Sequence, residues 1–136
     1  MHNEENCTFK IAEWSESPIQ VFENGAKLSS AKVTQDYHGA ITGQGTVDYQ
    51  MAYTVNGTAK FVGFETIQGV VAHKTGTFVI QHTGVFEEGK AKSRWSIVEG
   101  AGTGELRDLA GNGTYEAGHG EDAHVSFNYH FSAHSK

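Results

Sequence analysis

NGTAKFVGFETIQGVVAHKTGTFVIQHTGVFEEG, residues 56–89, is the stretch that decides the fold. It predicts two long strands, one running from the Asn56-Gly57 turn to about Val71 and one ending at Phe86, joined by a polar corner at residues 72–76. Asn-Gly and other glycine-containing corners between alternating apolar runs are strong hairpin signals. The rest of the chain extends this meander on both sides.

The first turn determines which side chains point inward. A two-residue Asn56-Gly57 loop would place Lys60 on the apolar side of the preceding strand, which is costly without a partner. A three-residue loop over 55–57, closed by a left-handed glycine, instead pairs Tyr53 with Ala59 and sends Lys60 to water. We therefore expect Phe61, Gly63, Glu65 and Ile67 inside and Val62, Phe64 and Thr66 outside.

The Glu87-Glu88-Gly89 corner is interpreted in the same way, as a three-residue loop. This pairs Phe86 with Lys90 and Gln81 with Trp95, and leaves the basic side chains of the last strand outside. The prediction places Thr77, Val79, Gln81, Trp95 and Ile97 inside, and Phe78, Ile80, His82, Phe86, Lys90, Lys92 and Arg94 outside.

Alternation predicts further strands on both sides of this hairpin, at residues 7–14, 31–41, 46–54, 90–98, 112–117 and 123–131. Between them we expect a polar connection at 15–30 and corners at 43–45 and 118–120. A single helical turn at 105–109, capped by Thr103, is also expected. About eight strands with no long helix favour a closed eight-stranded antiparallel β-barrel, because closure removes exposed edges. Such a barrel is filled by side chains or holds one small ligand.

Composition supports one domain over residues 1–136 and excludes some partners. The chain has 17 Gly and one Pro, a balance typical of tight glycine turns between strands. A net charge of -6 with scattered basic residues argues against nucleic acid and anionic membranes as partners.

The single cysteine, Cys7, cannot form an internal disulfide, which favours a reducing compartment. No apolar run reaches the length of a membrane helix, and the N-terminal residues do not form a signal peptide. We expect a cytoplasmic protein.

A string of motifs points to one family. The motifs are GQGTVDY (43–49), MAY (51–53), GTA (57–59), FVGFE (61–65), GTFVIQHTG (76–84), Trp95 and GTGEL (102–106). Together they resemble the bacterial family filed as domain of unknown function 3224. The resemblance implies a closed antiparallel barrel similar to allene oxide cyclase and the dirigent proteins, often paired as a homodimer. It implies no agreed activity, and likeness to a cyclase is analogy only. Relatives often carry Pro-Asp-Gly where this chain has Val55-Asn56-Gly57.

Glu65 is the candidate catalytic residue. Inside the barrel it would be desolvated near Met51, Phe61 and Trp95, and it could pass a proton to a bound substrate. The alternative is that it only accepts hydrogen bonds from neighbouring Tyr or Gln side chains and specifies the core.

Aromatic and polar side chains on the predicted inner face could line a ligand cavity, since each Tyr and Trp offers a flat surface and a polar tip. The alternative is plain core packing. The candidate ligand-binding residues are Tyr49, Met51, Tyr53, Phe61, Gln81, Trp95 and Tyr129.

Metal, cofactor and common hydrolase motifs are not expected. The eight His include no His-x-His pair, and the chain has neither a Gly-x-Ser-x-Gly elbow nor a phosphate-binding glycine loop. The GTGE segment at 102–105 is expected to close one end of the barrel, as an ordinary turn or as a lid.

An apolar patch is predicted on the outer wall. A monomer would rarely leave such a patch in water, so it predicts a homodimer with a two-fold interface. The predicted interface residues are Val62, Phe64, Phe78, Ile80 and Phe86.

Three functions remain open: a barrel that binds a small apolar or aromatic molecule, a cofactor-free isomerase or cyclase using Glu65, and a structural dimer with a filled core. A solvent-open cavity would favour the first two. A carboxylate of Glu65 that is fully hydrogen-bonded, with no vacant space beside it, would argue against chemistry.

Overall fold

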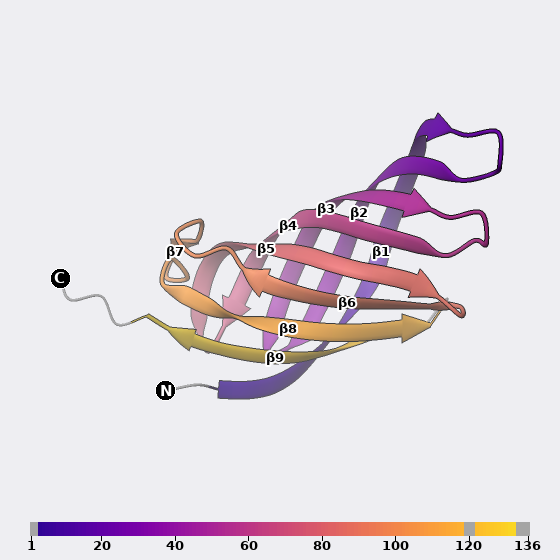
Figure 1. The fold of residues 1–136 in the computed structure, drawn as a ribbon. Coiled ribbons are helices and arrows are strands. Elements are labelled where there is room, and N and C mark those ends of the chain that lie inside the picture. The colour runs from indigo at the N-terminus through magenta and orange to yellow at the C-terminus, as the bar shows by residue number, and fades with distance from the viewer. Residues whose placement is uncertain (1–2, 119–121, 133–136) are drawn as a thin grey trace.

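The computed structural model describes residues 3–118 and 122–132, which form an antiparallel sheet curled into a barrel (Figure 1). The strands are β1 (Asn3–Val21), β2 (Lys27–Gly39), β3 (Ile41–Tyr53), β4 (Ala59–Val71), β5 (Lys74–Glu87), β6 (Lys90–Ile97), β7 (Thr103–Gly104), β8 (Leu109–Gly118) and β9 (Ala123–Phe131).

The strand order β4-β3-β2-β1-β9-β8-β6-β5 closes on itself because β4 also pairs with β5. The predicted closed eight-stranded antiparallel barrel is therefore confirmed, with the two-residue β7 added beside β5. Within the described residues there is no helix. The helical turn expected at 105–109 does not form. Residues 105–108 instead make successive tight turns, in which the Leu106 N–H donates to the Thr103 carbonyl and the Leu109 N–H donates to the Leu106 carbonyl, and Leu109 begins β8.

The register predicted for the first turn is confirmed. Tyr53 pairs with Ala59 across the three-residue loop. Glu65 and Ile67 are fully buried, whereas Val62 and Phe64 are 49% and 56% exposed. The inner and outer faces of β4 are thus those expected from keeping Lys60 in water.

The register predicted for β5 is wrong by one residue. The β5–β6 loop contains two residues, Glu88 (φ 54°) and Gly89 (φ 75°), so Glu87 pairs with Lys90 and His82 pairs with Trp95. Phe78, Ile80 and His82, predicted outside, are fully buried, while Gln81, predicted inside, is exposed.

Burial explains why the shorter loop is favoured. A left-handed conformation costs a residue such as Glu88 about 1–2 kcal/mol. Burying a Phe or an Ile side chain contributes about 1.5–3 kcal/mol each, so inward placement of Phe78 and Ile80 outweighs that cost.

Other predicted corners move for similar reasons. The β4–β5 connection is another two-residue turn, at Ala72 (φ 51°) and His73 (φ 66°), and the strand resumes at Lys74. The residues expected to form a corner at 43–45 lie inside β3. A side chain at position 43 would not fit, because its Cβ would lie 2.2 Å from the Gln68 carbonyl oxygen. The predicted corner at 118–120 falls largely outside the described residues.

The stretch expected as a polar connection, 15–30, forms the ends of β1 and β2 and the turn between them. This hairpin extends beyond the neighbouring strands (Figure 1). Register shifts in β1 around Ala12 and Ile19 mark two bulges. An extra residue bends a strand and changes which face its later side chains occupy. The first bulge keeps Trp14 opposite the buried Val33, on the inner face.

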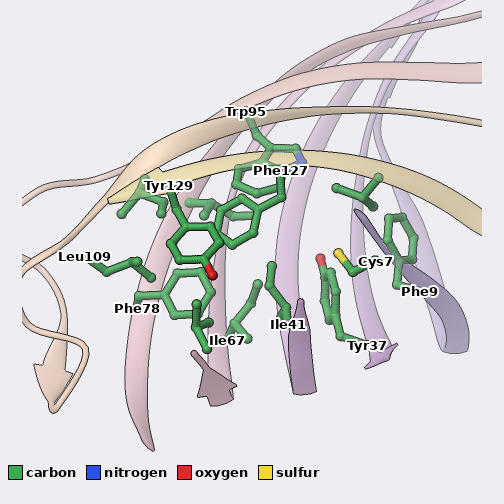
Figure 2. Close-up of a cluster of buried hydrophobic side chains, with 14 of the residues drawn as sticks. Cys7, Phe9, Tyr37, Ile41, Ile67, Phe78, Trp95, Leu109, Phe127 and Tyr129 are labelled. Atoms are coloured by element: carbon green, nitrogen blue, oxygen red, sulfur yellow. The ribbon is translucent and has the colours of Figure 1, made fainter. Parts of the chain in front are cut away.

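The barrel interior is packed at one end. Figure 2 shows this cluster, in which Phe127 stacks on Tyr129 with ring centroids 4.8 Å apart, beside Phe78 and Ile67. The fully buried Leu106 closes this end from the loop that carries β7. The 102–105 segment therefore belongs to the closed end, where the Thr75 N–H donates to Glu105 Oε1 at 2.9 Å.

The predicted apolar patch on the outer wall is smaller than expected. Phe78 and Ile80 are inside the barrel because of the β5 register, and Phe86, 37% exposed, lines an internal cavity. Val62 and Phe64 remain on the outer wall. The homodimer stays a prediction that now depends on these two side chains.

No helix in the described part of the chain is long and apolar enough to cross a membrane.

Candidate functional site

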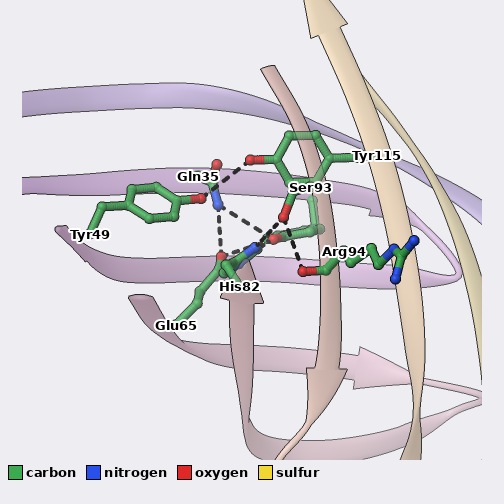
Figure 3. Close-up of polar contacts among 8 residues, drawn as sticks. Gln35, Tyr49, Glu65, His82, Ser93, Arg94 and Tyr115 are labelled. Carbon is green, nitrogen blue, oxygen red and sulfur yellow. Dashed lines mark hydrogen bonds and ion pairs between the residues drawn. The ribbon is translucent and has the colours of Figure 1, made fainter. Parts of the chain in front are cut away.

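The carboxylate of Glu65 lies at the centre of a buried polar layer across the middle of the barrel. The Tyr37 hydroxyl donates to both oxygens at 2.9 Å, and the Gln35 Nε2–H donates to Oε2 at 2.9 Å. His82 Nε2 lies 2.6 Å from Oε1 (Figure 3). Three strands, β2, β4 and β5, thus bring a carboxylate and three donors together without exposure to water.

His82 links this carboxylate to β6. Its Nδ1 lies 3.3 Å from the Ser93 hydroxyl oxygen, and Ser93 Oγ–H donates to the Arg94 carbonyl at 3.3 Å. The His82 and Glu65 side chains are both fully buried. An ionised carboxylate in such surroundings is stabilised only by close partners.

Gly45 makes room for the carboxylate. A Cβ atom at this position would lie 1.9 Å from Glu65 Oε2, closer than any real Cβ contact. The glycine in the middle of β3 is therefore required by the Glu65 side chain, and not by a turn.

Tyr49 and Tyr115 place two more hydroxyl groups in this layer, 3.3 Å apart. Burial, the Coulombic effects of Tyr115 and Glu65, and the hydrogen bond with Tyr115 together raise the pKa of Tyr49 well above its ordinary value. Burial raises the pKa of Tyr115 to about 12; Glu65 adds to the rise, and hydrogen bonds with Tyr49 and Ser93 oppose it. Both hydroxyls are accordingly protonated at neutral pH.

Above this layer the barrel holds a cavity of about 640 Å³. β1 pairs with β9 only as far as Phe9, so the later part of β1 leaves the wall open. Most of the lining is apolar, and Gln35, Tyr49 and Tyr115 supply the buried polar groups. The other lining residues are Phe9, Lys10, Ile11, Trp14, Met51, Ala59, Phe61, Phe86, Ala91, Ala117, Gly118, Asp122 and Ala123.

A second carboxylate, Glu16, stands on the hairpin beyond this opening. It accepts hydrogen bonds from Ser29 (2.8 Å), Tyr53 (2.9 Å) and Trp14 (3.1 Å). Partial burial raises the pKa of Glu16, but these hydrogen bonds outweigh it and hold the pKa below its ordinary value. The contacts fix Tyr53 and Trp14, so the hairpin is attached to the barrel rim.

The structure distributes the predicted site residues over several environments. Tyr49, Met51 and Phe61 line the cavity. Tyr53 is the last residue of β3 and donates a hydrogen bond to Glu16 on the hairpin, and Trp95 and Tyr129 belong to the packed cluster. Gln81 is on the outside, for the register reason given above, and is not available to an internal ligand.

Sequence reasoning missed four members of the polar layer: Gln35, Tyr37, His82 and Tyr115. In the sequence, Gln35 and Tyr37 fall on the same face of their strand as Val33, and polar side chains alternating with an apolar one on that face were a usable signal. His82 was missed because the register predicted for β5 was wrong by one residue.

Among the described residues, no group of three or more His, Cys, Asp or Glu side chains could hold a metal ion.

The fold and site define a class: a closed antiparallel β-barrel with one packed end, a buried polar layer and an open apolar cavity. The chain belongs to the family described as protein of unknown function DUF3224, whose model matches residues 5–129. It is similar to a solved structure from the same family, a protein with unknown function from Shewanella oneidensis MR-1. The TM-score is 0.78 with 20% identity, covering 98% of this chain and 100% of the other. At this identity the likeness shows the fold alone. No curated protein matches the chain.

Proposed function

We propose that the protein binds a small, mainly apolar or aromatic molecule in the open end of its barrel. The observation that carries this proposal is the cavity of about 640 Å³, with apolar walls and a few polar groups at its inner end. Small-molecule sites typically have this size and this combination of lining residues. A structural dimer with a filled core would not require such a space.

The arrangement of Glu65 supports binding over a cofactor-free isomerase or cyclase. Its oxygens already accept hydrogen bonds from Tyr37 and Gln35 and contact His82, and Glu65 does not line the cavity. A general acid or base must come within hydrogen-bond reach of the substrate. Here Gln35 and Tyr49 line the cavity, so Glu65 acts as the support of the polar layer.

The expected location is cytoplasmic. This part of the proposal is supported by the one cysteine of the chain, Cys7, which is a buried free thiol. Burial, with Glu65 as a smaller contributor, raises the pKa of this thiol to about 11, although a hydrogen bond with the Ile41 backbone opposes the rise.

Fluorescence of N-phenyl-1-naphthylamine, a neutral apolar probe, tests the proposal. We expect emission to rise on binding to the native protein. Leucine at Ala91 or Ala117, both lining residues, narrows the cavity and weakens binding by about tenfold or more. Ser96→Leu adds the same side chain on the exposed face of β6 and is the matched control. Binding that is absent in the native protein, or unaffected by Ala91→Leu and Ala117→Leu, would refute the proposal.

A further inference from the structure

Resting on the proposed function, we infer that the cavity selects a neutral cyclic molecule with one hydroxyl or carbonyl oxygen at its buried end. It discriminates against a carboxylate in that position. Three features carry the inference: the hydroxyl pair at the inner end, the charges around that pair, and the rings in the walls.

The hydroxyl pair offers hydrogen bonds to a ligand oxygen. The oxygens of Tyr49 and Tyr115 are 3.3 Å apart, longer than the usual O–H···O distance of about 2.7–2.8 Å. Their mutual hydrogen bond is therefore weak, and both residues line the cavity. A ligand hydroxyl can accept from one tyrosine and donate to the other, and a carbonyl can accept from either.

The charges around the pair favour a neutral group. Among the described lining residues the only cation is Lys10, whose side chain is exposed. The imidazole of His82 is 2.6 Å from Glu65 Oε1, so any positive charge on it is already paired. A carboxylate buried beside Tyr49 and Tyr115 would lose its hydration without gaining a counterion, and it would also approach the carboxylate of Glu65.

The walls fit a ring. Phe61 meets Tyr49 edge to face with centroids 5.1 Å apart, and Phe9 meets Tyr115 in the same way at 4.9 Å. These two aromatic pairs stand on β3–β4 and on β1–β8, and all four rings line the cavity. Flat aromatic surfaces favour a planar or cyclic ligand over a flexible chain, since stacking and edge contacts need a rigid partner.

Displacement of N-phenyl-1-naphthylamine by three molecules of one shape tests this selectivity at neutral pH. The competitors are 2-naphthol, which is neutral and carries a hydroxyl, 2-methylnaphthalene, which has no polar group, and 2-naphthoate, which is anionic. We expect 2-naphthol to bind about tenfold more tightly than either of the others. Tighter binding of 2-naphthoate than of 2-naphthol would overturn the inference while leaving the proposed function intact.

The double variant Tyr49→Phe/Tyr115→Phe assigns the preference to the hydroxyl pair. It keeps both rings, so 2-methylnaphthalene should bind as before while the advantage of 2-naphthol falls to about threefold or less. Tyr53→Phe, which removes a hydroxyl that bonds to Glu16 on the hairpin, is the control and should leave the preference unchanged. A full preference for 2-naphthol in the double variant would overturn the inference, and failure of the probe and all three competitors to bind would overturn both proposals.

Discussion

His82 Nε2 lies 2.6 Å from Glu65 Oε1, and neither side chain is exposed to solvent. The contact joins β4 to β5 at the centre of the barrel, between the packed end and the cavity. Because the Tyr37 and Gln35 donors also point at this carboxylate, stability and the shape of the inner cavity wall both depend on it.

Glu65→Gln is expected to destabilise the fold. An amide replaces one acceptor oxygen by a donor, which then faces the donors of Gln35, Tyr37 or His82. Leaving such buried donors without an acceptor costs about 1–3 kcal/mol or more. Urea unfolding measures the loss, with the exposed Glu99→Gln as control. A loss below about 1 kcal/mol would show that the polar layer does not stabilise the barrel.

Gly45→Ala is expected to be destabilising because of Glu65 and not because of the backbone. The added Cβ would lie 1.9 Å from Glu65 Oε2, and such overpacking costs about 1–3 kcal/mol. In a Glu65→Ala background this cost should largely disappear, which is measured as a double-mutant cycle by urea unfolding. Gly57→Ala, at a turn glycine with φ 85° and no neighbour within 4 Å, should cost the same in both backgrounds. Additive losses for Gly45→Ala and Glu65→Ala would contradict the packing argument.

Alkaline pH is expected to unfold the protein. Burial is the first cause of a raised pKa at all five tyrosines: Tyr37 and Tyr49 rise well above the ordinary value of 10.0, and Tyr53, Tyr115 and Tyr129 rise to about 12. The folded state then binds protons that the unfolded state releases. This stability is fully present below pH 10 and is lost as the pH rises towards 12. Urea midpoints and tyrosinate absorbance should change together. Tyrosinate formation near pH 10 in the folded protein would contradict this.

His73→Gly is expected to stabilise the fold. His73 has φ 66° in the β4–β5 turn, a left-handed conformation that costs a residue with a Cβ about 1–2 kcal/mol and costs glycine little. The gain should be about 0.5–1 kcal/mol once the flexibility of glycine in the unfolded chain is subtracted. Thermal and urea unfolding check it. Ala52→Gly, at an exposed position inside β3, should destabilise instead.

The predicted homodimer is expected to depend on Val62 and Phe64, the members of the predicted patch that remain on the outer wall. Sedimentation equilibrium of the native chain should give twice the 14.7 kDa of one chain. The double variant Val62→Thr/Phe64→Ser should give one chain mass with the fold retained. A native protein that sediments as a monomer would refute the dimer.

Much of the fold could be predicted from alternation and from one charged side chain. Keeping Lys60 in water was sufficient to set the β3–β4 register, and that register places Glu65 inside. The β5 register could not be set in the same way, because Glu88 in a left-handed conformation allows a two-residue loop where glycine alone suggested three. The free energy that decides the β5 register comes from burying Phe78 and Ile80, and this burial depends on the whole barrel and not on the turn.

The candidate site was only partly predictable for the same reason. Glu65, Tyr49 and Phe61 lie on strands whose register was correct, whereas His82 lies on the strand whose register was not. The role of Gly45 could not be inferred either, since a glycine that makes room for a distant side chain looks like a glycine in a turn until the strands are paired.

Because the barrel has a packed end and a hollow end, substitutions at the two ends are expected to have different effects on folding. Residues such as Phe127 and Leu106 contribute to the folding core, so changes there are penalised whatever the protein binds. Trp14 and Ile11, about half exposed at the opening, contribute less to that core. Under the proposed function, natural variation at the opening can therefore alter which molecule the cavity admits while the barrel scaffold persists.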